Sequence, residues 1–144
     1  MTDGKRRSHV ALIEDNPADV YLVREALRAC NLNCELTVFQ TFETAIDAVQ
    51  SGTLRELDAF LIDLNLRSGS GLDILEAIRG SQELRQTAVG IFTSSDSPRD
   101  RDAATQLGAN LYIRKPTELD SFLSEVGYAI ASLTGQAELR VAAQ

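Results

Sequence analysis

Short apolar, β-prone runs alternate with amphipathic segments along almost the whole of this 144-residue chain. The runs lie at residues 9–13, 35–39, 59–62, 89–93 and 111–113. Strands separated by helices form a parallel sheet that is covered on both faces. Five such units predict an α/β fold. Because crossover connections are right-handed, they favour a five-stranded, doubly wound parallel sheet of order 2-1-3-4-5.

The intervening segments carry helix signals of two kinds. Val20, Val23 and Leu27 share one helical face, and similar spacing recurs in the later segments. Helix starts are marked by a capping side chain, in two cases followed by proline at the first helical position. The predicted capping residues are Asn16, Ser70, Ser97 and Thr117.

The bulk properties of the chain exclude several classes of protein. A formal charge of −7 disfavours nucleic-acid binding. No apolar run approaches the ~20 residues of a membrane span, and no signal peptide follows the basic start, which predicts a cytoplasmic protein. Cys30 and Cys34 are too few for a disulfide scaffold, and His9 is the only histidine. We expect a flexible segment at 1–8, one domain at 9–134, a tail at 135–144 and no output domain.

Polar side chains stand at four of the expected strand ends. Glu14 and Asp15 follow the first strand, Asp63 the third, Thr93 ends the fourth, and Lys115 follows the fifth. In doubly wound sheets the carboxyl ends of the strands border one crevice. These side chains are therefore expected to converge.

Three of these residues are carboxylates, which repel one another unless a cation lies between them. Two like charges ~4 Å apart cost roughly 4 kcal/mol at an effective dielectric constant of 20. Lys115 supplies only one positive charge, and an all-oxygen ligand set favours Mg²⁺. A carboxylate such as Asp63 can also attack phosphorus and form an acyl phosphate. Lys115 and the Thr93 hydroxyl would then neutralise the phosphoryl oxygens.

Each residue also has a simpler explanation. Glu14 and Asp15 could be the acidic start of a helix, and Asp63 could be an ordinary strand exit. Thr93 could be a β-branched strand residue, and Lys115 a solvated surface lysine. Only their joint occurrence at four strand ends favours the phosphoryl-transfer hypothesis.

Taken together, these residues resemble the receiver domain of bacterial two-component response regulators, which has a flavodoxin-like fold. The matching motifs are Val10-Ala-Leu-Ile-Glu-Asp-Asn-Pro, Leu61-Ile-Asp-Leu-Asn-Leu, Gly71-Leu72, Phe92-Thr-Ser and Tyr112-Ile-Arg-Lys-Pro. The resemblance covers residues 10–133. It implies a phosphoacceptor signalling protein and not an enzyme in the usual sense, limited to its own phosphorylation and slow dephosphorylation.

The resemblance also implies a role for each site residue. Asp63 would accept the phosphoryl group, and Lys115 would pair with a phosphoryl oxygen. Mg²⁺ would be bound by Asp15, Asp63 and the backbone carbonyl of Asn65, with Glu14 acting mainly through water. Thr93 and Tyr112 would switch together on phosphorylation. The Lys115–Pro116 peptide bond is expected to be cis.

Partners follow from the same resemblance. The donor would be a sensor histidine kinase, and the output would pass to an unidentified downstream protein. Asn16-Pro-Ala-Asp together with Thr93-Ser-Ser resembles a subset of standalone receivers, some of which serve phytochrome-type kinases and dimerise. This predicts a homodimer through the fourth helix, fifth strand and fifth helix.

Two departures and three rival functions accompany this interpretation. Arg67 replaces a common proline, which predicts a looser loop at 68–71, and Thr117 replaces a frequent apolar residue. A haloacid-dehalogenase-type enzyme would carry its nucleophile on the first strand, with a second Asp two residues later, where this chain has Asn65. The second rival is an interaction module that no longer takes phosphate, and the third is a flavin-binding domain.

Overall fold

The computed structural model describes residues 7–136 as alternating strands and helices. The strands are β1 (Ser8–Ile13), β2 (Cys34–Phe39), β3 (Ala59–Ile62), β4 (Asn65–Leu66), β5 (Gly69–Ser70), β6 (Ala88–Thr93) and β7 (Leu111–Arg114). The helices are α1 (Pro17–Ala29), α2 (Phe42–Ser51), α3 (Gly71–Gly80), α4 (Pro98–Gln106) and α5 (Leu119–Leu133).

Five strands form a parallel sheet in the order β2-β1-β3-β6-β7. Because β6 and β7 are the fourth and fifth strands of this sheet, the predicted order 2-1-3-4-5 is confirmed. The two remaining strands, β4 and β5, pair antiparallel in a short hairpin after β3. The sequence predicts a loose loop there, and the structure instead has Asn65 opposite Ser70 and Leu66 opposite Gly69.

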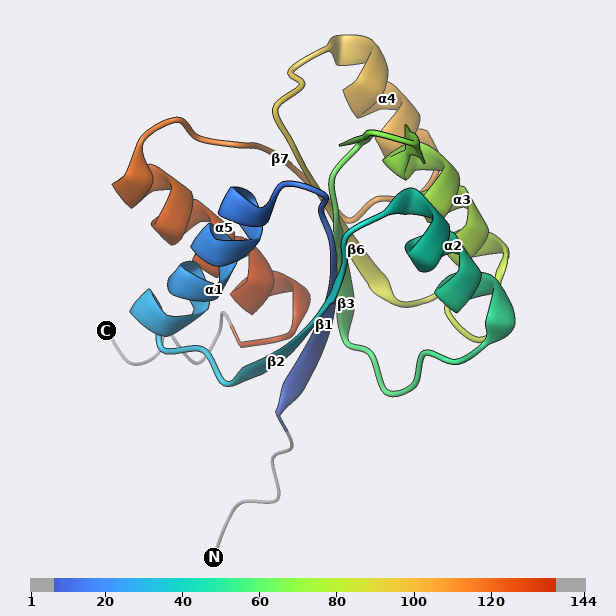
Figure 1. The fold of residues 1–144 in the computed structure, drawn as a ribbon, viewed down its shortest axis with the longest axis horizontal. Coiled ribbons are helices and arrows are strands. Elements are labelled where there is room, and N and C mark those ends of the chain that lie inside the picture. Colours follow the sequence, from blue (N-terminus) through green and yellow to red (C-terminus); the bar gives the residue numbers. More distant parts are fainter. Residues whose placement is uncertain (1–6, 137–144) are drawn as a thin grey trace, which may run out of the picture.

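Helices cover both faces of the sheet (Figure 1). Helices α1 and α5 lie on one side, while α2, α3 and α4 lie on the other. Alternate strand residues face the two sides. On β1, Val10 and Leu12 pack with the α1–α5 core, whereas Ala11 and Ile13 pack with the opposite core. The strands are therefore buried on both faces, as their continuous apolar runs predict.

The helix starts follow their capping residues in three of four predicted cases. The side chains of Asn16, Ser70 and Ser97 accept hydrogen bonds from the first turns of α1, α3 and α4. The prediction for Thr117 is wrong, because α5 begins one residue later, after Glu118, without a side-chain cap.

The predicted terminal segments lie mostly outside the described residues. Ser8 already belongs to β1, so the strand begins inside the segment 1–8 that was expected to be flexible. Of the tail at 135–144, only residues 135 and 136 are described, and the division at 134 stays a prediction. Across residues 7–136, no helix combines the length and apolar character that a membrane span requires.

Candidate functional site

The ends of β1 and β3 bring three carboxylates together. Ile13 of β1 pairs with Ile62 of β3, and the Asp63 N–H donates to the Ile13 carbonyl at 3.0 Å. The next residues along the two strands are Glu14 and Asp63, and Asp15 follows Glu14. One ligand oxygen from each of Glu14, Asp15 and Asp63 lies within 4.8 Å of the other two. The predicted convergence of these three side chains is therefore what the structure has.

Lys115, which follows β7, reaches into this carboxylate cluster from the far side of β6. Its Nζ donates to Glu14 at 2.8 Å and to Asp63 Oδ2 at 3.2 Å. A third carboxylate, Asp19 on α1, accepts from the same ammonium at 2.7 Å. Burial alone would lower the pKa of Lys115, but the hydrogen bonds that it donates to Asp19 and Glu14 outweigh burial and raise that pKa. The lysine is therefore a fixed positive charge.

Glu14 is the most enclosed charged group in the part of the chain that the structure describes. Its exposed fraction is 0%, and desolvation raises its pKa to about 7, although Lys115 opposes this shift. A carboxylate costs free energy in such a position unless a cation stays close. Lys115 is one such cation, and a bound metal ion would be another.

The residues present fit a hard divalent cation. Glu14, Asp15 and Asp63 offer oxygen atoms only, and no histidine or cysteine of the described chain joins this cluster. Mg²⁺ prefers such carboxylate ligands together with water. The Asn65 backbone N–H donates to Asp63 Oδ1 at 3.1 Å, which fixes the orientation of that carboxylate. The role predicted for the Asn65 carbonyl stays a prediction.

Thr93 ends β6 beside the cluster with its side chain fully buried. Its hydroxyl accepts hydrogen bonds from Asn65 Nδ2 and from the Ser95 N–H, both at 3.3 Å. The Thr93 carbonyl accepts from the Lys115 N–H at 2.7 Å. Thr93 is thus joined by hydrogen bonds to β4, which follows β3, and to the segment that follows β7.

Tyr112 lies on β7, half-buried and away from the carboxylates. Its hydroxyl donates to the Ser95 carbonyl at 3.1 Å, and the Arg101 guanidinium lies 4.5 Å from its ring centre. Burial raises the pKa of Tyr112. The tyrosine therefore contacts the loop that follows Thr93 and the helix that this loop leads into.

One predicted feature of this region is wrong. The described residues contain no cis peptide bond, so the Lys115–Pro116 bond is trans. The trans form is favoured for X–Pro bonds by about 0.5–1 kcal/mol. In the trans form the Lys115 side chain already reaches Glu14 and Asp63.

Two contacts of the site escaped the sequence-based prediction. Asp19 was not expected near Lys115, although an acidic residue in the first turn of a helix that follows the site is a usable signal. Arg67, which stands in place of a common proline, donates its backbone N–H to Asp15 Oδ2 at 2.8 Å. A proline at position 67 has no N–H and could not make this bond.

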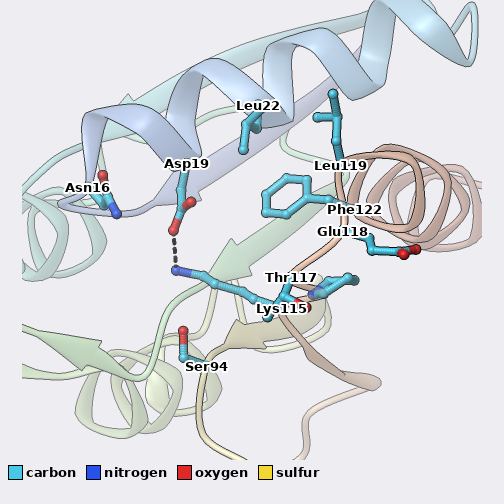
Figure 2. Close-up of a pocket in the computed structure, with 10 residues that line it drawn as sticks. Asn16, Asp19, Leu22, Ser94, Lys115, Thr117, Glu118, Leu119 and Phe122 are labelled. Atoms are coloured by element: carbon cyan, nitrogen blue, oxygen red, sulfur yellow. Dashed lines mark hydrogen bonds and ion pairs between the residues drawn. The ribbon is translucent and has the colours of Figure 1, made fainter.

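A groove of about 410 Å³ borders the site between the starts of α1 and α5. Figure 2 shows the Lys115 ammonium pointing to Asp19 across this groove, with Leu22, Leu119 and Phe122 on its apolar side. A polar rim and an apolar wall thus lie next to the carboxylate cluster.

Comparison with known proteins identifies the family. Residues 10–127 match the response regulator receiver domain. The chain belongs to this family. The identification agrees with the sheet order and with the acidic cluster, and it shows that residues 10–127 form a receiver domain and not a haloacid-dehalogenase-type fold.

Three relatives illustrate the similarity of this receiver to characterised ones. The transcriptional regulatory protein KdpE of Mycobacterium tuberculosis is 30% identical over 90% of this chain, which spans only 54% of KdpE. Response regulator Rcp1 of Synechocystis is 28% identical over 81% of this chain and 82% of its own. The Mn²⁺-bound structure of Rcp1 superposes with a TM-score of 0.78, over 87% of this chain and 92% of that one, at 27% identity.

The third relative is the phosphorylated cyanobacterial phytochrome response regulator RcpA. Its structure superposes with a TM-score of 0.80 over 88% of this receiver and 93% of its own chain, at 25% identity. Both structures thus share nearly the whole fold.

Proposed function

We propose that this receiver accepts a phosphoryl group on Asp63 from a sensor histidine kinase and signals through the resulting change of shape. One observation carries the proposal. The Asp63 carboxylate, 6% exposed, lies 3.2 Å from the Lys115 ammonium and within the cluster that it forms with Glu14 and Asp15. A nucleophilic carboxylate, a fixed cation and a set of metal ligands therefore occupy one site.

The transfer needs little more than correct positioning. One Asp63 oxygen attacks the phosphorus of a phosphohistidine on the kinase. The P–O bond forms as the P–N bond breaks, and the imidazole nitrogen keeps the electron pair. The Asn65 N–H holds the Asp63 carboxylate in place, and Lys115 stands ready to neutralise a phosphoryl oxygen.

Asp15, Asp63 and Glu14, together with the Asn65 carbonyl, would hold Mg²⁺. The ion would neutralise the charge that gathers on the transferring phosphoryl oxygens. That Rcp1, similar to this chain, has been solved with Mn²⁺ bound supports a divalent-cation requirement.

The switch would run from Thr93 to Tyr112. A phosphoryl group adds about −1.5 to −2 charges and strong acceptor oxygens, to which the Thr93 hydroxyl can donate. Thr93 would then leave Asn65 and carry the Ser95 segment with it. Because Tyr112 bonds to the Ser95 carbonyl and stacks on Arg101 of α4, its rotamer would change as this segment moves.

The kinase would be of the phytochrome type, and the output would pass through the surface formed by α4, β7 and α5. Phytochrome response regulators among the relatives support this choice of donor. On that surface, Tyr128 is 58% exposed beside an apolar hollow of about 310 Å³, which suits a homodimer contact. Sedimentation that shows only monomer, with and without a phosphoryl analogue, would remove the dimer.

The first test is intact-mass spectrometry after incubation with acetyl phosphate and Mg²⁺. We expect the wild type to gain one phosphoryl group and Asp63→Asn to gain none, because the amide is not a nucleophile for phosphorus. Addition of EDTA should prevent the gain in the wild type. Equal phosphorylation of both proteins would contradict the assignment of Asp63.

A further inference from the structure

The Lys115 ammonium contacts three carboxylates at unequal distances. Asp19 lies at 2.7 Å and Glu14 at 2.8 Å, while Asp63 lies at 3.2 Å. An ammonium has three N–H donors, so these contacts use all of them. Lys115 therefore has no donor to spare for a phosphoryl oxygen unless one of its present partners is released.

The two closer partners differ in what their release would cost. Glu14 is fully buried, so after losing Lys115 its carboxylate would have no water and would depend on a bound metal ion alone for a counter-charge. The Asp19 side chain is 18% exposed, and it borders the groove shown in Figure 2. Water in that groove can solvate Asp19 after its ion pair with Lys115 breaks.

We propose that Asp19 is a positioning residue that holds the Lys115 ammonium back from Asp63 until a phosphoryl group arrives, and then releases it. This inference rests on the proposed phosphorylation of Asp63. Before phosphorylation, Asp19 keeps Lys115 oriented and stops it from pairing closely with the nucleophile. Afterwards the phosphoryl oxygens, with their larger charge, take the donor that Asp19 gives up.

The Asp19–Lys115 ion pair has a predictable effect on the balance between the unphosphorylated and phosphorylated forms of the protein. Asp19 favours the unphosphorylated protein by the strength of its pair with Lys115. Both side chains are mostly buried, at 18% and 10% exposed, so the pair should lie between a surface ion pair and a buried charged hydrogen bond. Removing it should strengthen binding of a phosphoryl analogue about threefold to tenfold.

The chain allows a direct observation of this contact because it contains only two lysines, Lys5 and Lys115. Protein labelled with ¹⁵N in its lysine side chains gives one Nζ NMR signal from the site. We expect Asp19→Asn to shift the Lys115 signal in Mg²⁺ alone. With Mg²⁺ and beryllium fluoride, a phosphoryl analogue, the wild type and Asp19→Asn should give the same Lys115 signal.

Affinity for beryllium fluoride in Mg²⁺, measured by titration of the same signal, gives the energetic test. Asp19→Asn should bind about threefold to tenfold more tightly than the wild type, and Asp19→Glu should return toward the wild-type value. Glu118→Gln is the matched control, since Glu118 lines the same groove but its carboxylate points away from Lys115 (Figure 2). That control separates the contact from a general loss of negative charge, and its affinity should equal that of the wild type.

Different results overturn different steps of the proposal. An unchanged Lys115 signal in Asp19→Asn contradicts the holding role alone. A shift that persists with beryllium fluoride, or an affinity that does not rise above that of Glu118→Gln, contradicts the release step. A wild type that fails to bind the analogue at all contradicts the proposed function, and the release step with it.

Discussion

The two ends of the parallel sheet are built in opposite ways. At the carboxyl ends of β1 and β3, carboxylates crowd around Lys115. At the amino ends of β6 and β7, the Arg79 guanidinium donates to the backbone carbonyls of Thr87 and Gly108 at 2.7 Å each. It also reaches Asn110, whose side-chain oxygen accepts from the Val89 N–H at 2.8 Å. Carboxylates are thus clustered around one cation at the first end, whereas at the second end a cation is surrounded by neutral acceptors.

The residues at one end of the sheet serve the chemistry of the site, and those at the other end stabilise the fold. Clustered carboxylates reduce the stability of the fold, because like charges ~4 Å apart cost roughly 4 kcal/mol at an effective dielectric constant of 20. What the clustered carboxylates provide in return is a site that can bind a metal ion and a phosphoryl group. The Arg79 end faces no such repulsion and ties α3 to the segments that follow α4 and precede β6. Substitutions at the two ends should therefore change different measured quantities.

The largest effect should come from comparing the two glycines at the ends of α3. A Cβ at Gly71 would overlap the Asp63 carbonyl oxygen and crowd the Ile62 side chain, whereas a Cβ at Gly80 meets nothing within 4 Å. We expect Gly71→Ala to lower the free energy of unfolding by about 3 kcal/mol and to impair phosphorylation, because the backbone of the acceptor must move.

Gly80→Ala is the control on the same helix. It should leave phosphorylation unchanged and stabilise the protein by up to about 1 kcal/mol, since alanine is the better helix former. Urea unfolding and intact-mass spectrometry measure both quantities. Equal free energies of unfolding and equal phosphorylation of Gly71→Ala and Gly80→Ala would contradict the close approach of Gly71 to Asp63.

A smaller effect is expected at the Arg79 end. Arg79→Ala should lower the free energy of unfolding by about 2 kcal/mol, because several carbonyls lose a charged donor. Arg85→Ala is the matched control at the same end and should change it by less than about 0.5 kcal/mol. Phosphorylation measured at a temperature where each variant is folded should match the wild type. Loss of phosphorylation in folded Arg79→Ala would show that the two ends are not separable.

The smallest effect concerns Cys34 at the start of β2, also at the amino end of the sheet. Burial raises the pKa of this thiol from 9.0 to about 11. The unfolded chain therefore releases the proton first as the pH rises, and stability falls above pH 9. Between pH 8 and pH 10 the wild type should lose about 1 kcal/mol more than Cys34→Ala, because the smaller losses from groups such as Tyr112 are common to both proteins. If the free energy of unfolding falls by the same amount between pH 8 and pH 10 in the wild type and in Cys34→Ala, the raised pKa of the thiol is contradicted.

Most of the fold could be predicted from the sequence because its signals are local. The alternation of buried strands and amphipathic helices, with right-handed crossovers, left few topologies and favoured the order that the structure has. The β4–β5 hairpin was missed, since two-residue strands have no periodicity to detect. The start of α5 was misplaced by one residue because it was inferred from a capping residue, and this helix begins without a side-chain cap.

In the candidate site, too, some residues could be placed from the sequence and others could not. Glu14, Asp15, Asp63, Thr93 and Lys115 could be placed together because the carboxyl ends of parallel strands meet. The Asp19–Lys115 contact could not, since Asp19 lies on α1 and not at a strand end, and the contact depends on the rotamers of both side chains. The Lys115–Pro116 isomer was expected from the family resemblance alone, and no residue pattern in this chain bears on it.

Chemical mapping of the phosphorylated residue tests the central claim most directly. After incubation with acetyl phosphate and Mg²⁺, borohydride reduces an aspartyl phosphate to homoserine, which peptide mass spectrometry can locate. We predict homoserine at position 63 alone, and none when Mg²⁺ is withheld. Homoserine at position 15 or 19, hydroxynorvaline at position 14 (the reduction product of a glutamyl phosphate), or phosphate retained on a serine or threonine would contradict the assignment of Asp63 as the acceptor.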